Sequence, residues 1–332
     1  MKKIYLFWLL IYVPLMTVWP LSNVYSEEGI WVPLKNMDIN MGRGISFVDG
    51  RTGWAVGADL IYHTVDGGET WEKQRSAAGN HLLDVSFIDK DNGWAVGLNG
   101  IILHTSTGGA TWSRQTSTLE PEVFKGIPVS ITLSSVYFIN DKDGWIAASQ
   151  AILHTTNGGL TWERQHFGTR FNLLGVYFVD SQNGWAVGYD GVILHTTTGG
   201  KKRWGILPGW QKQDSGISEH LFDVFFIDKN NGWAVSANSI IHTENGGKTW
   251  IVQSRKQAKH LRRVRFIDYN HGWVIGTGKI LSTINGGKSW QAIDLGHNYD
   301  LADISFHGTR NGWIIGEHGI IFRYMKTDGT SK

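Results

Sequence analysis

Short runs of alternating apolar and polar residues recur along the chain, and each run ends at a turn signal. In one unit, residues 83–88 alternate and stop at an Asp-Asn-Gly turn, and apolar runs at 94–97 and 101–105 follow. A Gly-Gly pair then marks a hairpin, because glycine accepts the positive φ of tight turns, and residues 111–115 form a fourth run. Such period-two alternation is typical of half-buried strands, and no segment shows sustained helical periodicity. The pattern predicts an all-β protein built from four-stranded units.

The four-stranded unit repeats around two tryptophan positions. The first follows a glycine in the second strand and occurs seven times, at Trp54, Trp94, Trp145, Trp185, Trp233, Trp273 and Trp313. Most copies are followed by His-Thr, then Gly-Gly, then a second tryptophan. In the stretched fourth copy we assign this second position to Trp210 and not to Trp204, because Gln213 follows Trp210 as Gln74 follows Trp71. Four strands per repeat of about 40 residues are typical of a β-propeller blade.

The two ends of the chain complement each other. The last unit has three strands, the third at residues 320–323, but lacks the Gly-Gly-x-Thr-Trp run. At the other end, Trp31 precedes Trp54 by the same separation that Trp71 precedes Trp94. We therefore expect residues 29–34 to form the outer strand of the last blade, which removes an open edge. The predicted fold is a single seven-bladed β-propeller with four antiparallel strands per blade over residues 27–326, followed by a tail at 327–332.

The first 26 residues have the pattern of a secretory signal. Lys2 and Lys3 precede an apolar run at residues 4–19, and Ser26 offers a small residue before a cleavage site at Glu27. The alternative is an uncleaved N-terminal anchor, although the run is short for a membrane span and contains Pro14. Under either interpretation we expect the propeller to be exported to a periplasm, a thylakoid lumen or the extracellular space.

The charge balance and the absence of cysteine exclude several classes of function. The chain of 332 residues holds 31 Lys and Arg against 29 Asp and Glu. Removal of Lys2 and Lys3 leaves 29 bases and 29 acids, so the broad positive field of a nucleic-acid-binding protein is absent and we expect no nucleic-acid partner. The chain has no cysteine, which excludes disulfides, thiolate metal sites and a catalytic thiol.

The repeats resemble known families. Residues 64–71 resemble the Asp-box, or bacterial neuraminidase repeat, of sialidases, sortilin-like receptors and xyloglucanases. Asp66 keeps the acid, and Asn157, Asn245 and Asn285 replace it in other blades. Together with seven Gly-Trp strands behind an export signal, residues 29–324 resemble the photosystem II assembly and stability factor family. The chain lacks the N-terminal lipidation cysteine of many cyanobacterial members.

This resemblance implies a non-catalytic scaffold, and we expect a monomer without cofactors. It also implies a protein partner, a membrane-protein precursor or assembly intermediate, that binds an arginine-rich patch.

One basic segment departs from the repeat, and we predict that it binds the partner. Its residues are Arg255, Lys256, Lys259, Arg262, Arg263 and Arg265, with no acid among them. Arginine suits bidentate contact with carboxylates or phosphates. The alternative is a solvated loop paired with acids such as Asp223 and Glu219 on the neighbouring blade. Two inserts, at residues 117–131 and 201–209, are further candidate contacts on opposite faces, or else tolerated insertions.

Two other functions stay open at this point. One is an exported module that binds glycans or envelope proteins and has no photosynthetic role. The other is a glycoside hydrolase, which needs two suitably spaced carboxylates; the available acids are Asp59, Asp84, Asp190, Asp223 and Asp303. The arginine triad and Arg-Ile-Pro sequence of sialidases are not recognisable, so we predict no enzymatic activity.

The histidines do not indicate a metal-dependent enzyme. Five of them occupy one repeated position, one per blade, at His63, His104, His154, His195 and His242. This spreads them around the ring, too far apart to share an ion, so we predict a structural role and no metal site.

Overall fold

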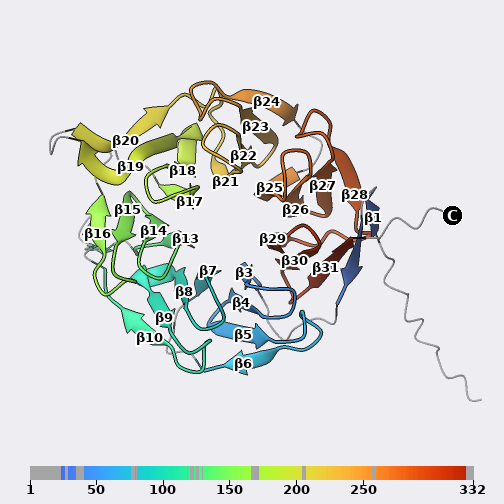
Figure 1. Ribbon diagram of the computed structural model, residues 1–332, viewed down its shortest axis with the longest axis horizontal. Helices are drawn as coiled ribbons and strands as arrows, with labels where there is room; N and C mark the ends of the chain where they lie inside the picture. Colours follow the sequence, from blue (N-terminus) through green and yellow to red (C-terminus); the bar gives the residue numbers. More distant parts are fainter. Residues whose placement is uncertain are drawn as a thin grey trace, which may run out of the picture.

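The chain forms a ring of antiparallel sheets in the computed structural model (Figure 1). The structure describes residues 24–26, 29–34, 41–75, 79, 81–117, 119, 123–124, 127–128, 130–165, 172–203, 207–255 and 259–326. These residues build seven blades, each with four antiparallel strands, and the last blade carries one strand more. The predicted all-β, seven-bladed propeller is confirmed.

The strands of each blade follow one another from the central axis outward. Blades 1 and 2 comprise β3 (Gly44–Phe47), β4 (Gly53–Gly57), β5 (Leu60–Thr64) and β6 (Glu72–Gln74), then β7 (Leu82–Phe87), β8 (Gly93–Gly97), β9 (Ile102–Thr105) and β10 (Ser113–Gln115). Blades 3 and 4 comprise β13 (Leu133–Phe138), β14 (Gly144–Ala148), β15 (Ala151–Thr155) and β16 (Glu163–Gln165), then β17 (Leu173–Phe178), β18 (Gly184–Gly188), β19 (Ile193–Arg203) and β20 (Leu207–Gln213). Blades 5 and 6 comprise β21 (Leu221–Phe226), β22 (Gly232–Ser236), β23 (Ser239–Thr243) and β24 (Ile251–Arg255), then β25 (Lys259–Phe266), β26 (Gly272–Thr277), β27 (Lys279–Thr283) and β28 (Gln291–Asp294).

Blade 7 joins the two ends of the chain, as predicted. Its inner strands are β29 (Leu301–His307), β30 (Asn311–Gly316) and β31 (Ile321–Lys326), and its fourth strand is the N-terminal β2 (Gly29–Pro33), which pairs with β31. A fifth strand, β1 (Val24–Ser26), pairs with the outer edge of β2. The predicted signal otherwise lies outside the described residues, as does the tail after Lys326. In the described part of the chain, no helix is long and apolar enough to cross a membrane.

Stacked rings join neighbouring blades. The second-strand tryptophan of each blade stacks on a phenylalanine in the inner strand of the next; Trp54 and Phe87, for example, have ring centroids 3.5 Å apart. On the other face of Trp54 lies the repeated histidine of the same blade, His63, at 4.8 Å. The other four repeated histidines stack on their own tryptophans in the same way. These positions therefore serve the packing of the ring.

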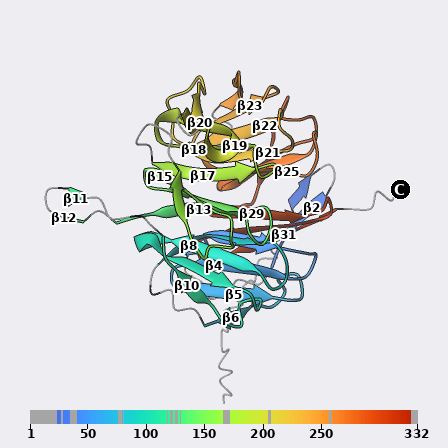
Figure 2. The same cartoon turned by 60° about the vertical axis from the view of Figure 1, so that its left-hand side comes forward.

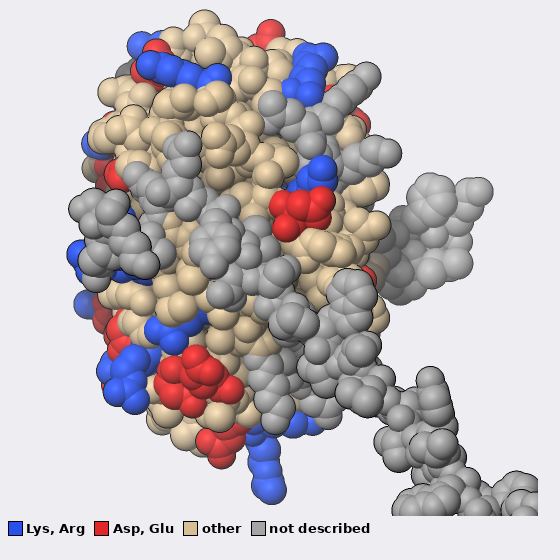
Figure 3. All heavy atoms as spheres, turned by 90° about the vertical axis from the view of Figure 1, so that its right-hand side faces the viewer, with Lys and Arg blue, Asp and Glu red and all other residues tan. Residues whose placement is uncertain are grey.

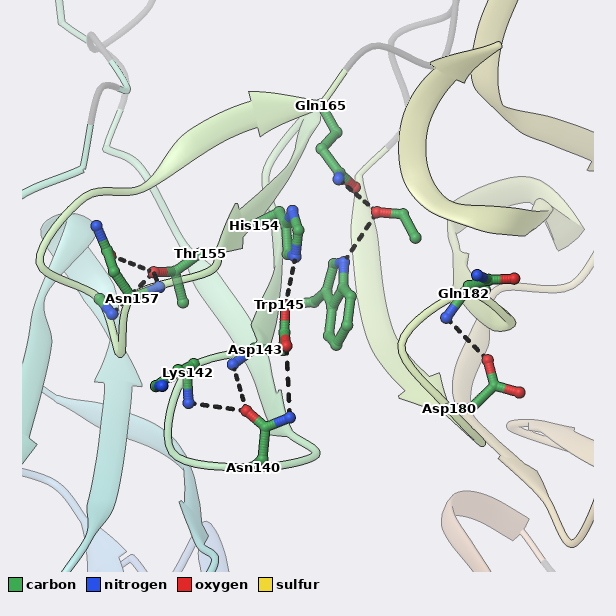
Figure 4. A network of polar contacts seen from close by, with 12 residues as sticks. Asn140, Lys142, Asp143, Trp145, His154, Thr155, Asn157, Gln165, Asp180 and Gln182 are labelled. Atoms are coloured by element: carbon green, nitrogen blue, oxygen red, sulfur yellow. Dashed lines mark hydrogen bonds and ion pairs between the residues drawn. The ribbon is translucent and has the colours of Figure 1, made fainter.

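Polar side chains extend this joint to the outer strands (Figure 4). Trp145 Nε1 and Gln165 Nε2 both donate to the carbonyl of Gly199 in the next blade, at 3.4 and 2.7 Å. The outer tryptophan of that next blade, Trp210, donates to Gln165 Oε1 at 2.8 Å. This contact confirms the assignment of Trp210 to the repeated position, with Gln165 as the residue that links the two blades.

Up-and-down strands divide the turns between two faces. The Gly-Gly hairpins and the turns after the inner strands share one face, because Gly108 N–H donates to Asp91 O at 2.9 Å; we call it the Asp-box face. The opposite side, the connection face, carries the links between blades and the turns after the second strands, where Leu98 N–H donates to His81 O at 2.9 Å. The insert at residues 117–131 includes β11 (Val123–Phe124) and β12 (Ile127–Pro128), a hairpin that extends away from the ring (Figure 2).

Candidate binding site at the channel mouth

One residue from every blade borders a depression of about 340 Å³ on the connection face. Each of these residues directly precedes the channel-facing position of its inner strand. In blade order they are Arg43, Leu83, Ser134, Leu174, Phe222, Arg262 and Ala302. We call this ring the mouth. Its cationic arc consists of Arg262 of blade 6 and Arg43 of blade 1, on either side of Ala302 of blade 7, and its largely apolar arc lies on blades 2 to 5.

The cationic arc keeps hydrogen-bonding capacity. The Arg262 side chain is 34% exposed and its Nη2 lies 2.8 Å from Asp300 Oδ2. Thr277 donates to the other oxygen of Asp300 at 3.0 Å, which holds that carboxylate in place. Arg43 has no ion pair with a described residue, and its Nη2 lies 3.9 Å from Met41 Sδ. Both guanidinium groups therefore retain N–H donors for a ligand at the mouth.

A charged layer lies one residue deeper. Arg263 Nε lies 3.1 Å from Asp303 Oδ1, and Arg265 Nη1 lies 2.6 Å from Asp223 Oδ2. Arg263 lines the mouth, whereas Arg265, Asp84 and Asp303 line a second hollow of about 450 Å³ that reaches the Asp-box face. The charged layer thus lies between two hollows of the same channel.

The three carboxylates of this layer connect neighbouring blades. Each accepts a hydrogen bond from a backbone N–H in the inner strand of the next blade. The donors are Val136 to Asp84 at 2.8 Å, Val264 to Asp223 at 3.0 Å, and Ile45 to Asp303 at 2.9 Å. Burial raises the pKa of Asp84, and the nearby charge of Asp303 raises it further. Burial also raises the pKa of Asp303, although Arg263 and Arg265 oppose the shift.

The structure divides the predicted basic segment. Arg262, Arg263 and Arg265 converge on the channel from β25, while Arg255 is exposed at the end of β24. Lys259 begins β25, and Lys256 lies outside the described residues.

The acids around the segment make it less cationic than its sequence suggests. Asp223 pairs with an arginine of the segment, as the alternative interpretation held. Glu219 instead accepts hydrogen bonds from Ser236 and Ser239 of its own blade.

Sequence reasoning did not identify Arg43, the second arginine of the mouth, or Asp300, the partner of Arg262. Arg43 directly precedes Gly44, just as Arg262 directly precedes Arg263 at the equivalent repeat position. An alignment of the repeats could therefore have predicted that Arg43 lies at the mouth with Arg262. Asp300 left no such signal, because it comes from the link into blade 7 and not from a repeated strand position.

The remaining candidate residues do not gather in one place. Asp59 and Asp190 lie on exposed turns after second strands, apart from the three acids of the channel. The insert at 201–209 extends the β19–β20 hairpin of blade 4. At its base, Asp143, His154 and Lys201 border a polar hollow of about 420 Å³. Among the described residues, no group of three or more His, Asp or Glu is placed to hold a metal ion.

The rim on the side of blades 6 and 7 shows both signs of charge. In Figure 3, lysines and arginines lie next to small groups of acids at several places on the described surface. This view contains no continuous basic field, in agreement with the balanced charge of the sequence.

These features define an Asp-box β-propeller that presents an amphipathic mouth on one face. The family model described as photosynthesis system II assembly factor YCF48 matches residues 27–121, 76–171, 206–298 and 252–331. The chain belongs to this family.

Solved structures agree with the fold. A structure described as YCF48 bound to D1 peptide is 23% identical, with a TM-score of 0.73, and the match covers 94% of this chain and all of that one. YCF48 from Cyanidioschyzon merolae is 21% identical, with a TM-score of 0.69 and coverage of 89% and 98%. The WD40 propeller domain of Doa1 reaches a TM-score of 0.70 at 10% identity, covering 92% and 98%. The sequence matches no curated protein.

Proposed function

We propose that this protein is a non-catalytic, exported scaffold that binds an extended segment of a protein partner at the mouth. The observation that carries the proposal is the arrangement of the seven mouth residues, with Arg43 and Arg262 beside an arc that contains Leu83, Leu174 and Phe222. Arginine binds carboxylates through paired N–H donors, and the apolar arc gains free energy when it covers an apolar side chain. The mouth therefore fits a peptide that carries a carboxylate next to an apolar residue.

Two observations support the class of partner. A propeller of the same fold has been solved with a D1 peptide, which supports a peptide ligand for this chain too. The secretory pattern of residues 1–26 supports export, where a membrane-protein precursor or assembly intermediate is accessible. We propose that the protein acts as a monomer at such a partner.

The channel acids support a scaffold more than an enzyme. Asp84, Asp223 and Asp303 each accept a backbone N–H of the next blade, and two of them also pair with arginines. A carboxylate that joins two blades is poorly placed to act as a nucleophile or a mobile acid. We therefore assign these groups to the cohesion of the ring.

The proposal is tested by titrating a labelled D1 peptide with the mature protein and measuring fluorescence anisotropy. We expect the double variant Arg43→Glu/Arg262→Glu to bind at least about tenfold more weakly, because two attractive charges become repulsive. Its melting temperature should change little, since the Arg262–Asp300 pair is part exposed and such pairs contribute at most about 1 kcal/mol.

Arg255→Glu is the matched control, because it reverses a charge of the same segment at the exposed end of β24. This variant should bind like the wild type. Reversal of Arg263 and Arg265 is not a clean test, since it also breaks the contacts that join the blades. Peptide binding that is indifferent to Arg43 and Arg262, or no peptide binding at all, would contradict the proposed function.

A further inference from the structure

We propose that the channel carboxylates Asp84, Asp223 and Asp303 take up one proton in mildly acidic solution and thereby strengthen the binding of a negatively charged segment at the mouth. This inference rests on the proposed function and concerns the regulation of the same site. It assigns to the charged layer a second role besides joining the blades.

The charged layer is unbalanced by one negative charge. It contains three carboxylates, on β7, β21 and β29, but two guanidinium groups, both on β25. Asp223 is paired with Arg265, and Asp303 with Arg263. Asp84 makes no ion pair with a described residue, and its oxygens accept the N–H groups of Val85 and Val136 at 2.9 and 2.8 Å. Asp84 is therefore the carboxylate for which the layer supplies no cation.

The surroundings of Asp84 favour its protonated form. Burial raises the pKa of Asp84, and the charge of Asp303 on β29 adds to the effect. The charge of Arg263 on β25 and the hydrogen bonds from Val136 and Ser135 oppose it, but the net shift is upward. The other ionisable side chains that face this part of the channel are Tyr137 on β13, Tyr177 on β17, Asp223 on β21 and Arg265 on β25. Arg43, directly before β3, and His260 on β25 line the mouth. Because the layer has one carboxylate more than it has arginines, a single proton makes it neutral.

The layer acts on the mouth through Arg263. This arginine lines the mouth while its Nε contacts Asp303, so the negative charge beneath it reduces the positive potential above it. Removal of one unit charge at a separation on the order of 10 Å, in surroundings close to water, changes the affinity for a unit anion about two- to fourfold. The mouth should therefore bind an anionic peptide more tightly when Asp84 is protonated.

The test uses the D1 peptide with a free C-terminal carboxylate and compares its affinity between about pH 7.5 and about pH 5 for the wild type and for Asp84→Asn. The amide oxygen of Asn can still accept the Val136 N–H, so the joint between blades 2 and 3 is kept. We expect the wild type to gain about two- to fourfold in affinity on acidification. Asp84→Asn should already bind more tightly at neutral pH and should lose the part of the gain that Asp84 supplies. Any contribution from the peptide or from His260, which also lines the mouth, is common to both proteins and cancels in their comparison.

Asp190→Asn is the matched control, since it removes a charge from an exposed turn on the connection face and leaves the channel intact. It should retain the pH response of the wild type. An Asp84→Asn variant that also retains this response would overturn the inference.

A second measurement does not depend on the peptide. The carboxyl carbon of Asp84, followed by NMR in the free protein, should titrate above the usual aspartate range, which centres near about 4. Titration within that range would overturn the inference as well. If the peptide binds at no pH, the proposed function fails, and the Asp84 titration alone still decides whether the channel takes up the proton.

Discussion

At the residue scale, the same position can keep its geometry while its chemistry changes. In blade 1, Asp66 Oδ1 accepts the Thr70 N–H at 3.0 Å. In blade 3, Asn157 Oδ1 accepts the Thr161 N–H at the same distance. An amide oxygen is sufficient because the hairpin needs an acceptor and not a charge. The loss of the acid from most Asp-boxes, which is visible in the sequence, therefore leaves the fold intact.

The inner-strand acids are less tolerant. We expect Asp223→Ala to lower the free energy of unfolding by about 2–4 kcal/mol, because it leaves the Val264 N–H without an acceptor and the Arg265 guanidinium without its counter-ion. Urea unfolding measures this loss. Lys90→Ala is the control, since it removes the exposed pair with Asp49 and should cost less than about 1 kcal/mol. Equal losses in the two variants would contradict the role assigned to Asp223.

At the scale of single elements, the N-terminal strand β2 closes the ring. Trp31 on this strand is fully buried, and its ring lies 5.3 Å from that of Tyr324 and 6.5 Å from that of Trp273. It therefore joins blade 7 both to its own third strand and to blade 6. Closure of the ring therefore involves this side chain as well as the pairing of β2 with β31.

Trp31→Ala should lower the free energy of unfolding by about 3–5 kcal/mol, the range for removing a large buried aromatic ring. The transition should stay cooperative, because the blades share one continuous set of contacts. Thermal and urea unfolding followed by tryptophan fluorescence would show this. Met325→Ala, an exposed position on the neighbouring strand, serves as the control and should change little. An unchanged free energy of unfolding in Trp31→Ala would contradict the role of β2 in closing the propeller.

The strands also show which features of the fold can be predicted from the sequence. The strand order, the closure of the ring and the position of Trp210 follow from the repeat, because equivalent residues make equivalent packing contacts in every blade. The pairing of Arg263 with Asp303 does not follow, since the register shows that both face the channel but not which partners meet across it. Strand β1 was also missed, because its residues satisfy the composition of a signal segment equally well.

At the scale of the whole molecule, the stacked histidines make stability depend on pH. Burial lowers the pKa of His63, His104, His154 and His242, and lowers that of His195 to about 4. In the unfolded chain these groups protonate near about 6.5. The folded state thus binds fewer protons, so its stability is complete above that pH and declines as the pH falls towards about 4.

We therefore expect the melting temperature to fall between about pH 7 and about pH 5, with His195 alone contributing roughly 1–2 kcal/mol at the lower pH. Asp84 and Asp303 act in the opposite direction, because their raised pKa values favour protonation of the folded state. Five histidines against two acids leave a net loss on acidification. His195→Phe keeps a ring against Trp185 but cannot titrate, so calorimetry should show a smaller loss for this variant. A variant as sensitive to acid as the wild type would mean that the stacked histidines do not set this dependence.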